Sequence, residues 1–220
     1  MANGCFITFE GIEGSGKSTQ VRRLARRLRD AGREVVETRE PGGTLAGECV
    51  RKILKRGVGA ESLAAETELL LFAASRAQLV RKVIRPAVEA GAVVICDRFA
   101  DSTTVYQGIA RALGAEDVAR INAFAMGGIR PHLTLLLDLD VEEGFRRLHA
   151  APSRRKAGPD RIERESRQFH EAVRRGYLGL AREEPQRFRI LQAVREPTEV
   201  AETIWELVRD VLRQQHPTVR

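Results

Sequence analysis

The sequence has few cysteines, histidines and aromatic residues, and each shortage argues against a class of protein. Its three cysteines are widely spaced and form no CxxC pair, which argues against a disulfide framework and indicates a reducing compartment. The four histidines form no HExxH pattern and no cluster with cysteine, so we expect no dedicated zinc site. Aromatic residues make up only 5% of the chain and are not interleaved with the basic residues, as a stacking platform for single-stranded nucleic acid would require.

Long apolar runs are absent as well. No run approaches the ~18 residues that a membrane-spanning helix needs. The first eight residues carry no basic segment ahead of their apolar one, as a signal peptide would. We therefore expect a cytoplasmic protein with no membrane partner. The chain has 220 residues without an internal repeat, low-complexity tract or linker, which predicts a single domain over residues 1–220.

Positive charge is in excess, with 37 lysines and arginines against 30 acidic residues and a net charge of +7. Only five of the 37 are lysine. Nucleic-acid binding is one interpretation of such an excess, and a general bias towards arginine at helix surfaces is another. We favour a third, in which some of the arginines bind small phosphorylated ligands, and we expect no nucleic-acid partner.

Short apolar segments alternate with longer helical patterns along the chain. Helical patterns cover residues 61–90, where Pro86 would kink or break the helix, and residues 199–213. Asp101 is placed to cap a helix over residues 102–110. The segments expected to form strands are residues 5–10, 34–38, 92–96, 133–138 and, more weakly, 187–191. Apolar strands separated by helices are typical of a parallel sheet covered on both faces, so the sequence predicts a three-layer α/β/α fold with a five-stranded parallel sheet.

Residues 11–18 (GIEGSGKS) match the pattern G-x-x-x-x-G-K-[ST] in full, between a predicted strand and a predicted helix. The glycines let the backbone wrap so that its N–H groups face an anion, and the lysine reaches the β- and γ-phosphates. A simple glycine turn would not need the Lys17-Ser18 pair. The residues expected to bind ATP are Gly11, Ile12, Glu13, Gly14, Ser15, Gly16, Lys17, Ser18 and Thr19.

The phosphate loop does not by itself define the reaction. No N-K-x-D sequence is present, which argues against a GTPase, and a small P-loop phosphotransferase fits the chain length better than a motor ATPase. Asp97 and Arg98 directly follow a predicted strand. We expect Asp97 to bind Mg²⁺ together with Ser18, and Arg98 to act with Lys17 in catalysis. A structural salt bridge is the alternative role for Asp97 and Arg98.

A polar, basic segment near residue 155 is the candidate for a lid. Residues 151–160 (APSRRKAGPD) are rich in proline and glycine, which fits a mobile lid over about residues 151–163 and, equally, a solvated loop. Arginines on such a lid would stabilise charge on the transferring phosphoryl group. The candidates for this role are Arg154, Arg155, Lys156 and Arg161.

Some helical pairs have the residue types that recognise a base and a sugar. Phe72 and Arg76 are four residues apart, so a ring that stacks on a base would lie beside a guanidinium that donates to its edge. Core packing is the equally compatible role for Phe72. Two more pairs share a helix face: Ser102 with Tyr106, and Thr103 with Gln107.

These segments together resemble the bacterial thymidylate kinases, a family of P-loop nucleoside monophosphate kinases. The resemblance covers nearly the whole chain and is carried by FEG at residues 9–11, TREPGGT at 38–44, LFAASR at 71–76, DRF at 97–99 and DRIE at 160–163. Gly14 stands where some members carry a catalytic arginine, which implies that the lid supplies the positive charge here. His132 replaces the aspartate that is usual in R-P-D-L-T, a change that we expect to be tolerated.

The resemblance implies transfer of the γ-phosphate of ATP to dTMP, giving dTDP and ADP for dTTP synthesis, with Mg²⁺, in a cytoplasmic homodimer. It implies that Phe72 stacks on thymine, that Arg76 bonds its O4 edge and that Tyr106 lies beneath the deoxyribose. The catalytic residues it implies are Lys17, Arg98, Arg161, Arg154 and Arg155. The residues it implies for dTMP are Glu13, Arg39, Glu40, Pro41, Arg51, Phe72, Arg76, Arg98, Ser102, Thr103, Tyr106 and Gln107.

Two alternatives stay open. A kinase for another nucleoside monophosphate would use the same phosphate loop, although the segments at residues 38–44 and 71–76 favour dTMP. A nucleic-acid-binding P-loop ATPase would account for the basic charge, and it predicts salt-sensitive DNA binding with DNA-stimulated hydrolysis.

Overall fold

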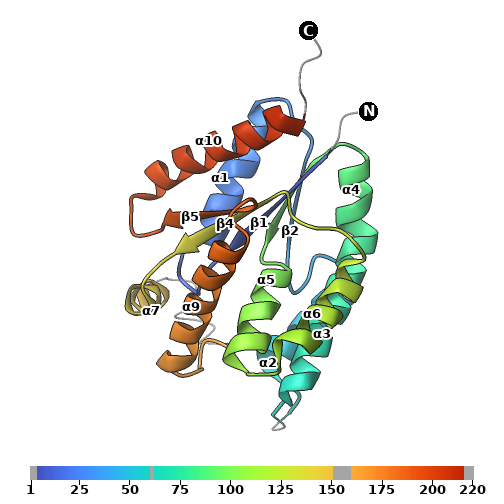
Figure 1. The fold of residues 1–220 in the computed structure, drawn as a ribbon, viewed down its shortest axis with the longest axis vertical. Helices are drawn as coiled ribbons and strands as arrows, with labels where there is room; N and C mark the ends of the chain where they lie inside the picture. The colour runs from blue at the N-terminus through green and yellow to red at the C-terminus, as the bar shows by residue number, and fades with distance from the viewer. Residues whose placement is uncertain (1–3, 60–61, 151–159, 216–220) are drawn as a thin grey trace.

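The computed structural model describes residues 4–59, 62–150 and 160–215 (Figure 1). Its centre is a parallel sheet of five strands in the order β2-β3-β1-β4-β5. The strands are β1 (Cys5–Glu10), β2 (Val35–Arg39), β3 (Val93–Asp97), β4 (Leu133–Asp138) and β5 (Phe188–Gln192). The predicted five-stranded parallel sheet is confirmed, with β2, β3 and β5 each shifted by one residue from the expected bounds.

The central strand β1 is buried on both faces, because its alternate side chains enter two different cores. Ile7 and Phe9 join one core, whereas Phe6 joins the other. Helices α1 (Lys17–Asp30) and α10 (Pro197–Gln215) cover the first face, while η1 (Val80–Ile84) and α4 (Arg85–Glu89) cover the second (Figure 1). The three-layer arrangement predicted from the apolar strands is therefore confirmed.

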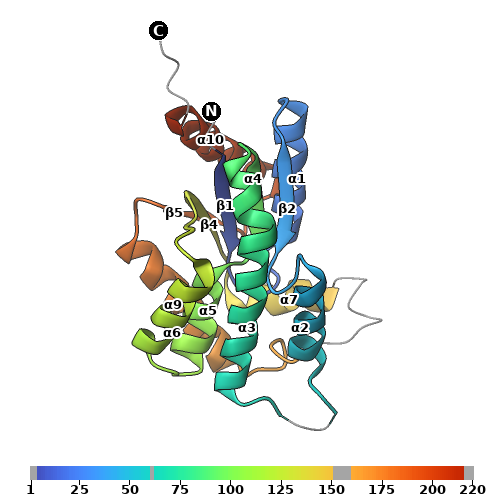
Figure 2. The ribbon, with the colours of Figure 1, turned by 90° about the vertical axis from the view of Figure 1, so that its right-hand side faces the viewer.

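Helix α3 (Ala65–Leu79) continues through η1 into α4, so Pro86 does not end the helix. The proline ring lacks an N–H, and the wider π-type turn of η1 comes immediately before it. The continuous rod of α3, η1 and α4 runs along the molecule in Figure 2, beside α2 (Leu45–Arg56) at its α3 end.

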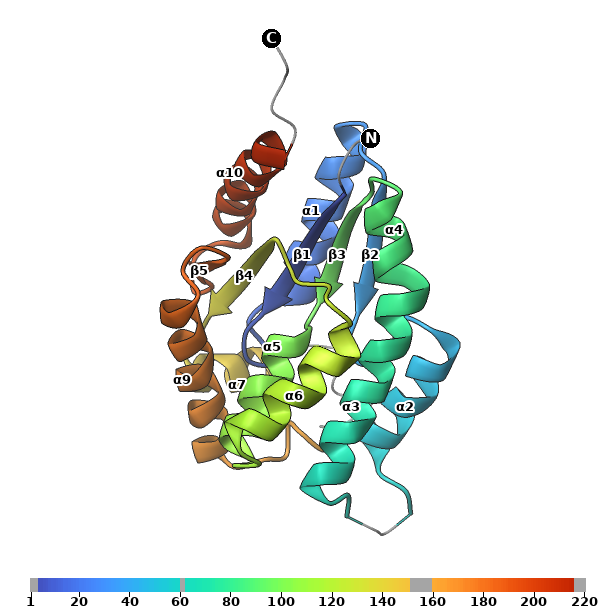
Figure 3. The same ribbon diagram turned by 45° about the vertical axis from the view of Figure 1, so that its right-hand side comes forward.

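The remaining helices gather where the strands end (Figure 3). They are α5 (Ala100–Thr103), η2 (Thr104–Ala110), α6 (Ala115–Met126), α7 (Val141–Ala150) and α9 (Arg167–Glu183). The prediction that Asp101 caps a helix was wrong. Phe99 occupies the capping position, and the Asp101 carboxylate instead accepts two hydrogen bonds from Arg187, at 2.7 and 2.8 Å. The Asp101 carboxylate therefore bonds the Arg187 guanidinium, which is far away in the sequence, and not the backbone N–H groups of its own helix.

Most of the predicted lid, including Arg154, Arg155 and Lys156, lies outside the described residues; its end, at residues 160–163, lies within them. Lys55 on α2 pairs with Asp160 at 3.1 Å, which fixes that end against α2. In the described ranges no helix is long and apolar enough to cross a membrane.

Candidate active site

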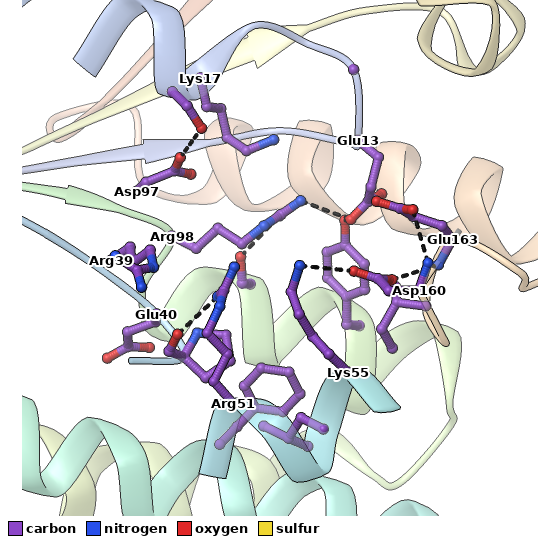
Figure 4. A pocket seen from close by; sticks show the side chains of 18 of the residues that line it. Glu13, Lys17, Arg39, Glu40, Arg51, Lys55, Asp97, Arg98, Asp160 and Glu163 are labelled. Atoms are coloured by element: carbon purple, nitrogen blue, oxygen red, sulfur yellow. Dashed lines mark hydrogen bonds and ion pairs between the residues drawn. The ribbon is translucent and has the colours of Figure 1, made fainter. Parts of the chain in front are cut away.

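A cleft of about 520 Å³ opens at the carboxyl ends of the strands (Figure 4). The chain leaves β1 there between its two neighbours β3 and β4, which is where open parallel sheets bind ligands. Its walls come from the loop after β1, from the ends of β2 and β3, and from α2, α3, α5, η2, α7 and residues 160–163.

The phosphate loop forms one end of the cleft. Gly14 and Gly16 have positive φ angles of 77° and 90°, a conformation that costs a side-chain-bearing residue about 1–2 kcal/mol. Gly14 also packs against α7, where a Cβ would lie 2.3 Å from the Gly144 carbonyl oxygen. A side chain at residue 14 would therefore collide with the backbone of α7 unless the loop moved.

Lys17 is folded back onto its own loop. Its Nζ donates to the carbonyl oxygens of Gly11 at 3.0 Å and Ile12 at 2.7 Å, and to Ser15 Oγ at 3.2 Å. Burial, and then the nearby Arg98 guanidinium, lower the pKa of Lys17 to about 8. An ammonium desolvated in this way gains strongly from a polyanion, because phosphate oxygens can replace the loop carbonyls as partners.

Ser18 and Asp97 meet at the other side of the loop, with Ser18 Oγ donating to Asp97 Oδ2 at 2.6 Å. Both line the cleft. A hydroxyl and a single carboxylate suit Mg²⁺, which usually keeps several waters and takes its other ligands from nucleotide phosphates. In the parts of the chain that the structure describes, no group of three or more His, Cys, Asp or Glu residues could hold a metal without such help.

Arg98 occupies the middle of the cleft with a backbone φ of 73°, unusual for a residue other than glycine. Two backbone hydrogen bonds hold it there: its own N–H to the Phe9 carbonyl at 2.9 Å, and the Phe99 N–H to Glu10 Oε1 at 2.7 Å. Its guanidinium donates to Gly11 O at 3.0 Å and to Glu13 Oε1 at 2.8 Å.

Glu13 is the acidic partner of this end. It accepts the Tyr106 hydroxyl at 2.8 Å and lies 3.3 Å from His170 Nδ1. Burial would raise the pKa of Glu13, but Arg98 and His170 more than offset it and hold that pKa well below its usual range. Glu13 is therefore a carboxylate at neutral pH, able to accept a hydrogen bond from a sugar hydroxyl.

Glu10 lies beneath Arg98 and is fully buried. Its carboxylate accepts hydrogen bonds from Phe99 N, Ser102 Oγ and Tyr177 OH, each at 2.7 Å. Burial, with a smaller contribution from Asp101, raises the pKa of Glu10 to about 7.

Two more arginines face Arg98 across the cleft (Figure 4). Arg39 pairs with Glu48 at 2.8 Å, and Arg51 donates to the Pro41 carbonyl at 2.9 Å. Burial, and then the charge of the Arg39 guanidinium, lower the pKa of Arg51, because each disfavours the charged form of Arg51. A second phosphate between the arginines would relieve the repulsion between these two cations.

The end of the cleft opposite the phosphate loop contains Phe72, Thr103 and Gln107. Arg76 lies behind them and does not line the cleft: it is 0% exposed, with hydrogen bonds to Glu40, Thr103 and to Asn122 Oδ1 at 2.7 Å. Its predicted contact with a base stays a prediction.

Most of the predicted site residues come together in this cleft. Those that line it are Glu13, Gly14, Gly16, Lys17, Ser18, Thr19, Arg39, Glu40, Pro41, Arg51, Phe72, Asp97, Arg98, Ser102, Thr103, Tyr106 and Gln107. Gly11, Ile12 and Ser15 lie behind the loop surface as partners of Lys17. Arg161 faces away from the cleft, donating to the Leu54 carbonyl at 3.1 Å and pairing with Glu68, and its catalytic role stays a prediction.

Five polar residues that support the site were not predicted from the sequence: Glu10, Glu68, Asn122, His170 and Tyr177. Only Glu10, within FEG, stood in a segment that drew attention. The others lie on helices far along the chain from their partners. From the sequence alone, a single polar residue on such a helix cannot be told apart from one that is exposed to solvent.

The site has two parts. A glycine-rich loop after a strand holds a lysine for phosphate, and a second compartment is lined by arginines. Together they define a P-loop phosphotransferase that acts on a phosphorylated small molecule. The comparisons with known proteins are more specific. The family model for thymidylate kinase matches residues 9–204. The chain therefore belongs to the thymidylate kinase family.

Individual thymidylate kinases are similar to this chain over most of their length. The chain is 53% identical over 189 residues to the thymidylate kinase of Geobacter sulfurreducens, covering 86% of this chain and 88% of that protein. It is 49% identical over 211 residues to that of Deinococcus radiodurans, covering 96% and 98%. The crystal structure of thymidylate kinase from Ehrlichia chaffeensis superposes with a TM-score of 0.72 at 32% identity, covering 94% of this chain and 99% of that one.

Proposed function

We propose that the phosphate-loop end of the cleft binds ATP and that the Phe72 end binds dTMP, with Arg98 between the two phosphates. As a thymidylate kinase, the protein transfers a phosphoryl group from ATP to dTMP, giving dTDP and ADP. The observation that supports the assignment of the two ends best is that a phosphate loop and an aromatic pocket share one cleft, with Arg98 in its middle.

The acceptor needs no general base. A phosphate monoester has a second pKa near ~6, so dTMP is mainly a dianion at neutral pH and its oxygen is already nucleophilic. The difficulty is to bring two polyanions together in a site that excludes water. In our proposal, Arg39 and Arg51 hold the acceptor phosphate, Lys17 holds the donor, and Arg98 contacts both and stabilises charge on the group in transit.

Ser18 and Asp97 would hold Mg²⁺. When bound, the ion would offset the negative charge of the triphosphate. The Ser18 hydroxyl donates to the Asp97 carboxylate at 2.6 Å, and Asp97 lies beside Lys17 of the phosphate loop (Figure 4), which supports this role.

Glu13 and Tyr106 are proposed to hold the sugar. The carboxylate of Glu13 can accept from a deoxyribose hydroxyl, and Tyr106, whose hydroxyl is bound to Glu13, fixes the side chain that does so. The Tyr106 ring would lie beneath the deoxyribose.

We further propose that residues 1–220 are one catalytic domain and that a lid at about residues 151–163 supplies positive charge. The crowding at Gly14 supports this, because the charge cannot come from that loop position. Arg154, Arg155, Lys156 and Arg161 are the candidates. The expected cytoplasmic location and lack of a nucleic-acid partner remain predictions.

A homodimer is proposed through α3 and α6. These helices are in contact and form one side of the molecule (Figure 2). Phe124 on α6 is 81% exposed and Leu70 on α3 is 56% exposed. A large aromatic side chain with this exposed fraction favours the interpretation that a second copy of the chain covers this face.

The reaction is tested by identifying its products. The protein is incubated with ATP, Mg²⁺ and dTMP, and the nucleotides are separated by anion-exchange chromatography. One dTDP should form for each ADP. Formation of ADP with inorganic phosphate but no dTDP would contradict a kinase and favour an ATPase.

A further inference from the structure

Two helices face each other at the aromatic end of the cleft and are joined by a pair of polar contacts. On α3, Glu68 and Arg76 lie one turn to either side of Phe72. Each bonds a residue of the facing helix: Glu68 accepts from Gln107 Nε2 at 2.6 Å, and Arg76 Nη2 donates to Thr103 Oγ1 at 2.8 Å. The two partners on that helix, Thr103 and Gln107, line the cleft together with Phe72.

Glu68 is buried deeply for an acidic residue. Its side chain is 1% exposed, and it is held by the guanidiniums of Arg111 at 3.3 Å and of Arg161. The expected catalytic machinery includes no role for this carboxylate. A carboxylate in such a position needs paired charge and full hydrogen bonding, and here part of that bonding comes from the amide of Gln107.

The contact fixes which way the Gln107 amide points. A carboxylate only accepts, so the amide nitrogen must face Glu68. The amide oxygen, Oε1, is then the acceptor that remains for the cleft, and it has no partner among the described residues. Rotating the amide would place two acceptors 2.6 Å apart and lose a charge-assisted hydrogen bond.

Arg76 fixes Thr103 in the opposite sense. A guanidinium only donates, so Thr103 Oγ1 accepts from it and its own proton is left to donate. The cleft therefore presents a donor at Thr103 and an acceptor at Gln107. A base with a carbonyl oxygen next to a ring N–H matches this pattern. Cytosine, with an amino group next to a bare ring nitrogen, mismatches it at both positions.

We propose that Glu68 is the positioning residue that selects a pyrimidine carrying N3–H, by holding the Gln107 amide with its oxygen toward the base. This inference rests on the proposed binding of dTMP at the Phe72 end. Thymine and uracil share this edge, so Glu68 separates both of them from cytosine but does not separate them from each other.

The test is the ratio of kcat/KM for dTMP to kcat/KM for dCMP, measured with saturating ATP and Mg²⁺. The variant Glu68→Gln keeps the shape of the side chain but accepts either orientation of the Gln107 amide. The ratio should fall by about tenfold or more, with dUMP following dTMP. Loss of a shared catalytic group such as Arg161 would lower turnover of all three acceptors equally and leave the ratio unchanged.

Two further variants separate orientation from stability. Glu165→Gln removes the other acidic partner of Arg111, at 2.6 Å, without touching Gln107, and should keep the wild-type ratio. The double variant Glu68→Gln, Gln107→Glu exchanges the two groups. The new amide at position 68 donates to the new carboxylate at position 107, whose other oxygen is then a fixed acceptor toward the base. It should regain most of the preference for dTMP over dCMP.

The outcomes distinguish this inference from the proposed function. If the wild-type protein does not phosphorylate dTMP, the proposed function fails. If the wild-type protein prefers dTMP, the proposed function stands. If Glu68→Gln then keeps the ratio within about threefold of the wild-type value, the role of Glu68 is overturned. Failure of the double variant to regain the preference would also overturn it, provided that it melts as cooperatively as Glu68→Gln.

Discussion

Arg98 and Glu13 form a salt bridge inside the cleft, with Arg98 Nη2 2.8 Å from Glu13 Oε1. The pair connects the end of β3 to the phosphate loop. Glu13 also contacts Tyr106 and His170. The guanidinium is therefore anchored both to residues that we propose for the sugar and to the loop that we propose for the triphosphate. A cation held this firmly loses little freedom when a substrate arrives, which is how a preorganised site lowers a barrier.

Replacing Arg98 with alanine should therefore remove most of the activity. Arginines that contact the transferring phosphoryl group contribute about 10³–10⁵ in rate in related enzymes, and we expect kcat for Arg98→Ala to fall by at least about 10³. Coupled ADP release measures kcat, and circular dichroism checks that the variant is folded. Arg120→Ala, at a 70% exposed arginine on α6, is the matched control and should keep its activity. Unchanged turnover in Arg98→Ala would refute the role.

Phe72→Ala should raise the KM for dTMP and leave kcat nearly unchanged. A base that stacks on an aromatic ring gains about 1–3 kcal/mol, so KM should rise by roughly five- to 150-fold. Phe72→Tyr keeps the ring and should keep a KM close to the wild-type value. If the KM of Phe72→Ala does not change, the ring only packs the core.

The pKa of Glu10 predicts a pH dependence of stability. Burial raises it from an ordinary value of 4.5 to about 7, so between these pH values the folded protein binds more protons than the unfolded chain. The free energy of unfolding should then fall as the pH rises through this window. In Glu10→Gln this contribution, on the order of 3 kcal/mol, is absent.

Urea unfolding at pH 5 and pH 8 measures the effect. The loss of stability between the two pH values should be smaller in Glu10→Gln than in the wild type. Glu183→Gln, at an exposed position of α9, should behave as the wild type does. An equal loss in all three proteins would show that Glu10 does not titrate in this range.

Gly14→Ala should weaken ATP binding by at least about tenfold, because a Cβ placed 2.3 Å from Gly144 O forces the loop away from α7. Gly32→Ala is the matched control. Gly32 has nearly the same φ, 76° against 77°, but a Cβ there meets nothing within 4 Å. It should cost only about 1–2 kcal/mol of stability and leave the KM for ATP unchanged. Equal ATP affinity in the two variants would mean that the crowding at Gly14 is unimportant.

Phe124→Asp should convert the proposed dimer to monomers. A charge placed at the exposed ring position cannot be buried without a partner. Sedimentation velocity of the wild type should give about 49 kDa, twice the 24.5 kDa of one chain, and the variant half of that. A wild type that sediments as a monomer would contradict the dimer.

The sequence was sufficient for the features that depend on local patterns. Apolar strands between helices indicated the parallel sheet, and the residues around Lys17 indicated the phosphate loop. We expect His132 to be tolerated where an aspartate is usual, and this stays a prediction. Its Nδ1 accepts the Phe6 N–H at 2.9 Å, a hydrogen bond that a carboxylate oxygen could also accept.

Local sequence patterns could not predict the contacts between segments that are far apart in the sequence. Sequence spacing placed Arg76 one turn from Phe72, but it did not show that Glu40, 36 residues away, and Asn122, 46 residues away, hold most of the donors of Arg76. Asp101 looked like a helix cap because Arg187, 86 residues away, was not visible as a competitor. Local spacing shows which face a residue occupies, but not which partner on another element meets it.

The most direct measurement compares acceptors in one assay of ADP release with ATP and Mg²⁺. The acceptors are dTMP, dUMP, UMP, dCMP, AMP, GMP and thymidine, each taken to kcat/KM. The expected result is the highest kcat/KM for dTMP, with dCMP and the purine nucleotides far below it. Comparable turnover of dCMP or AMP would contradict the assignment of the Phe72 end to dTMP while leaving the phosphate loop and Arg98 in place. No turnover of any acceptor, with hydrolysis stimulated by DNA, would contradict the kinase itself.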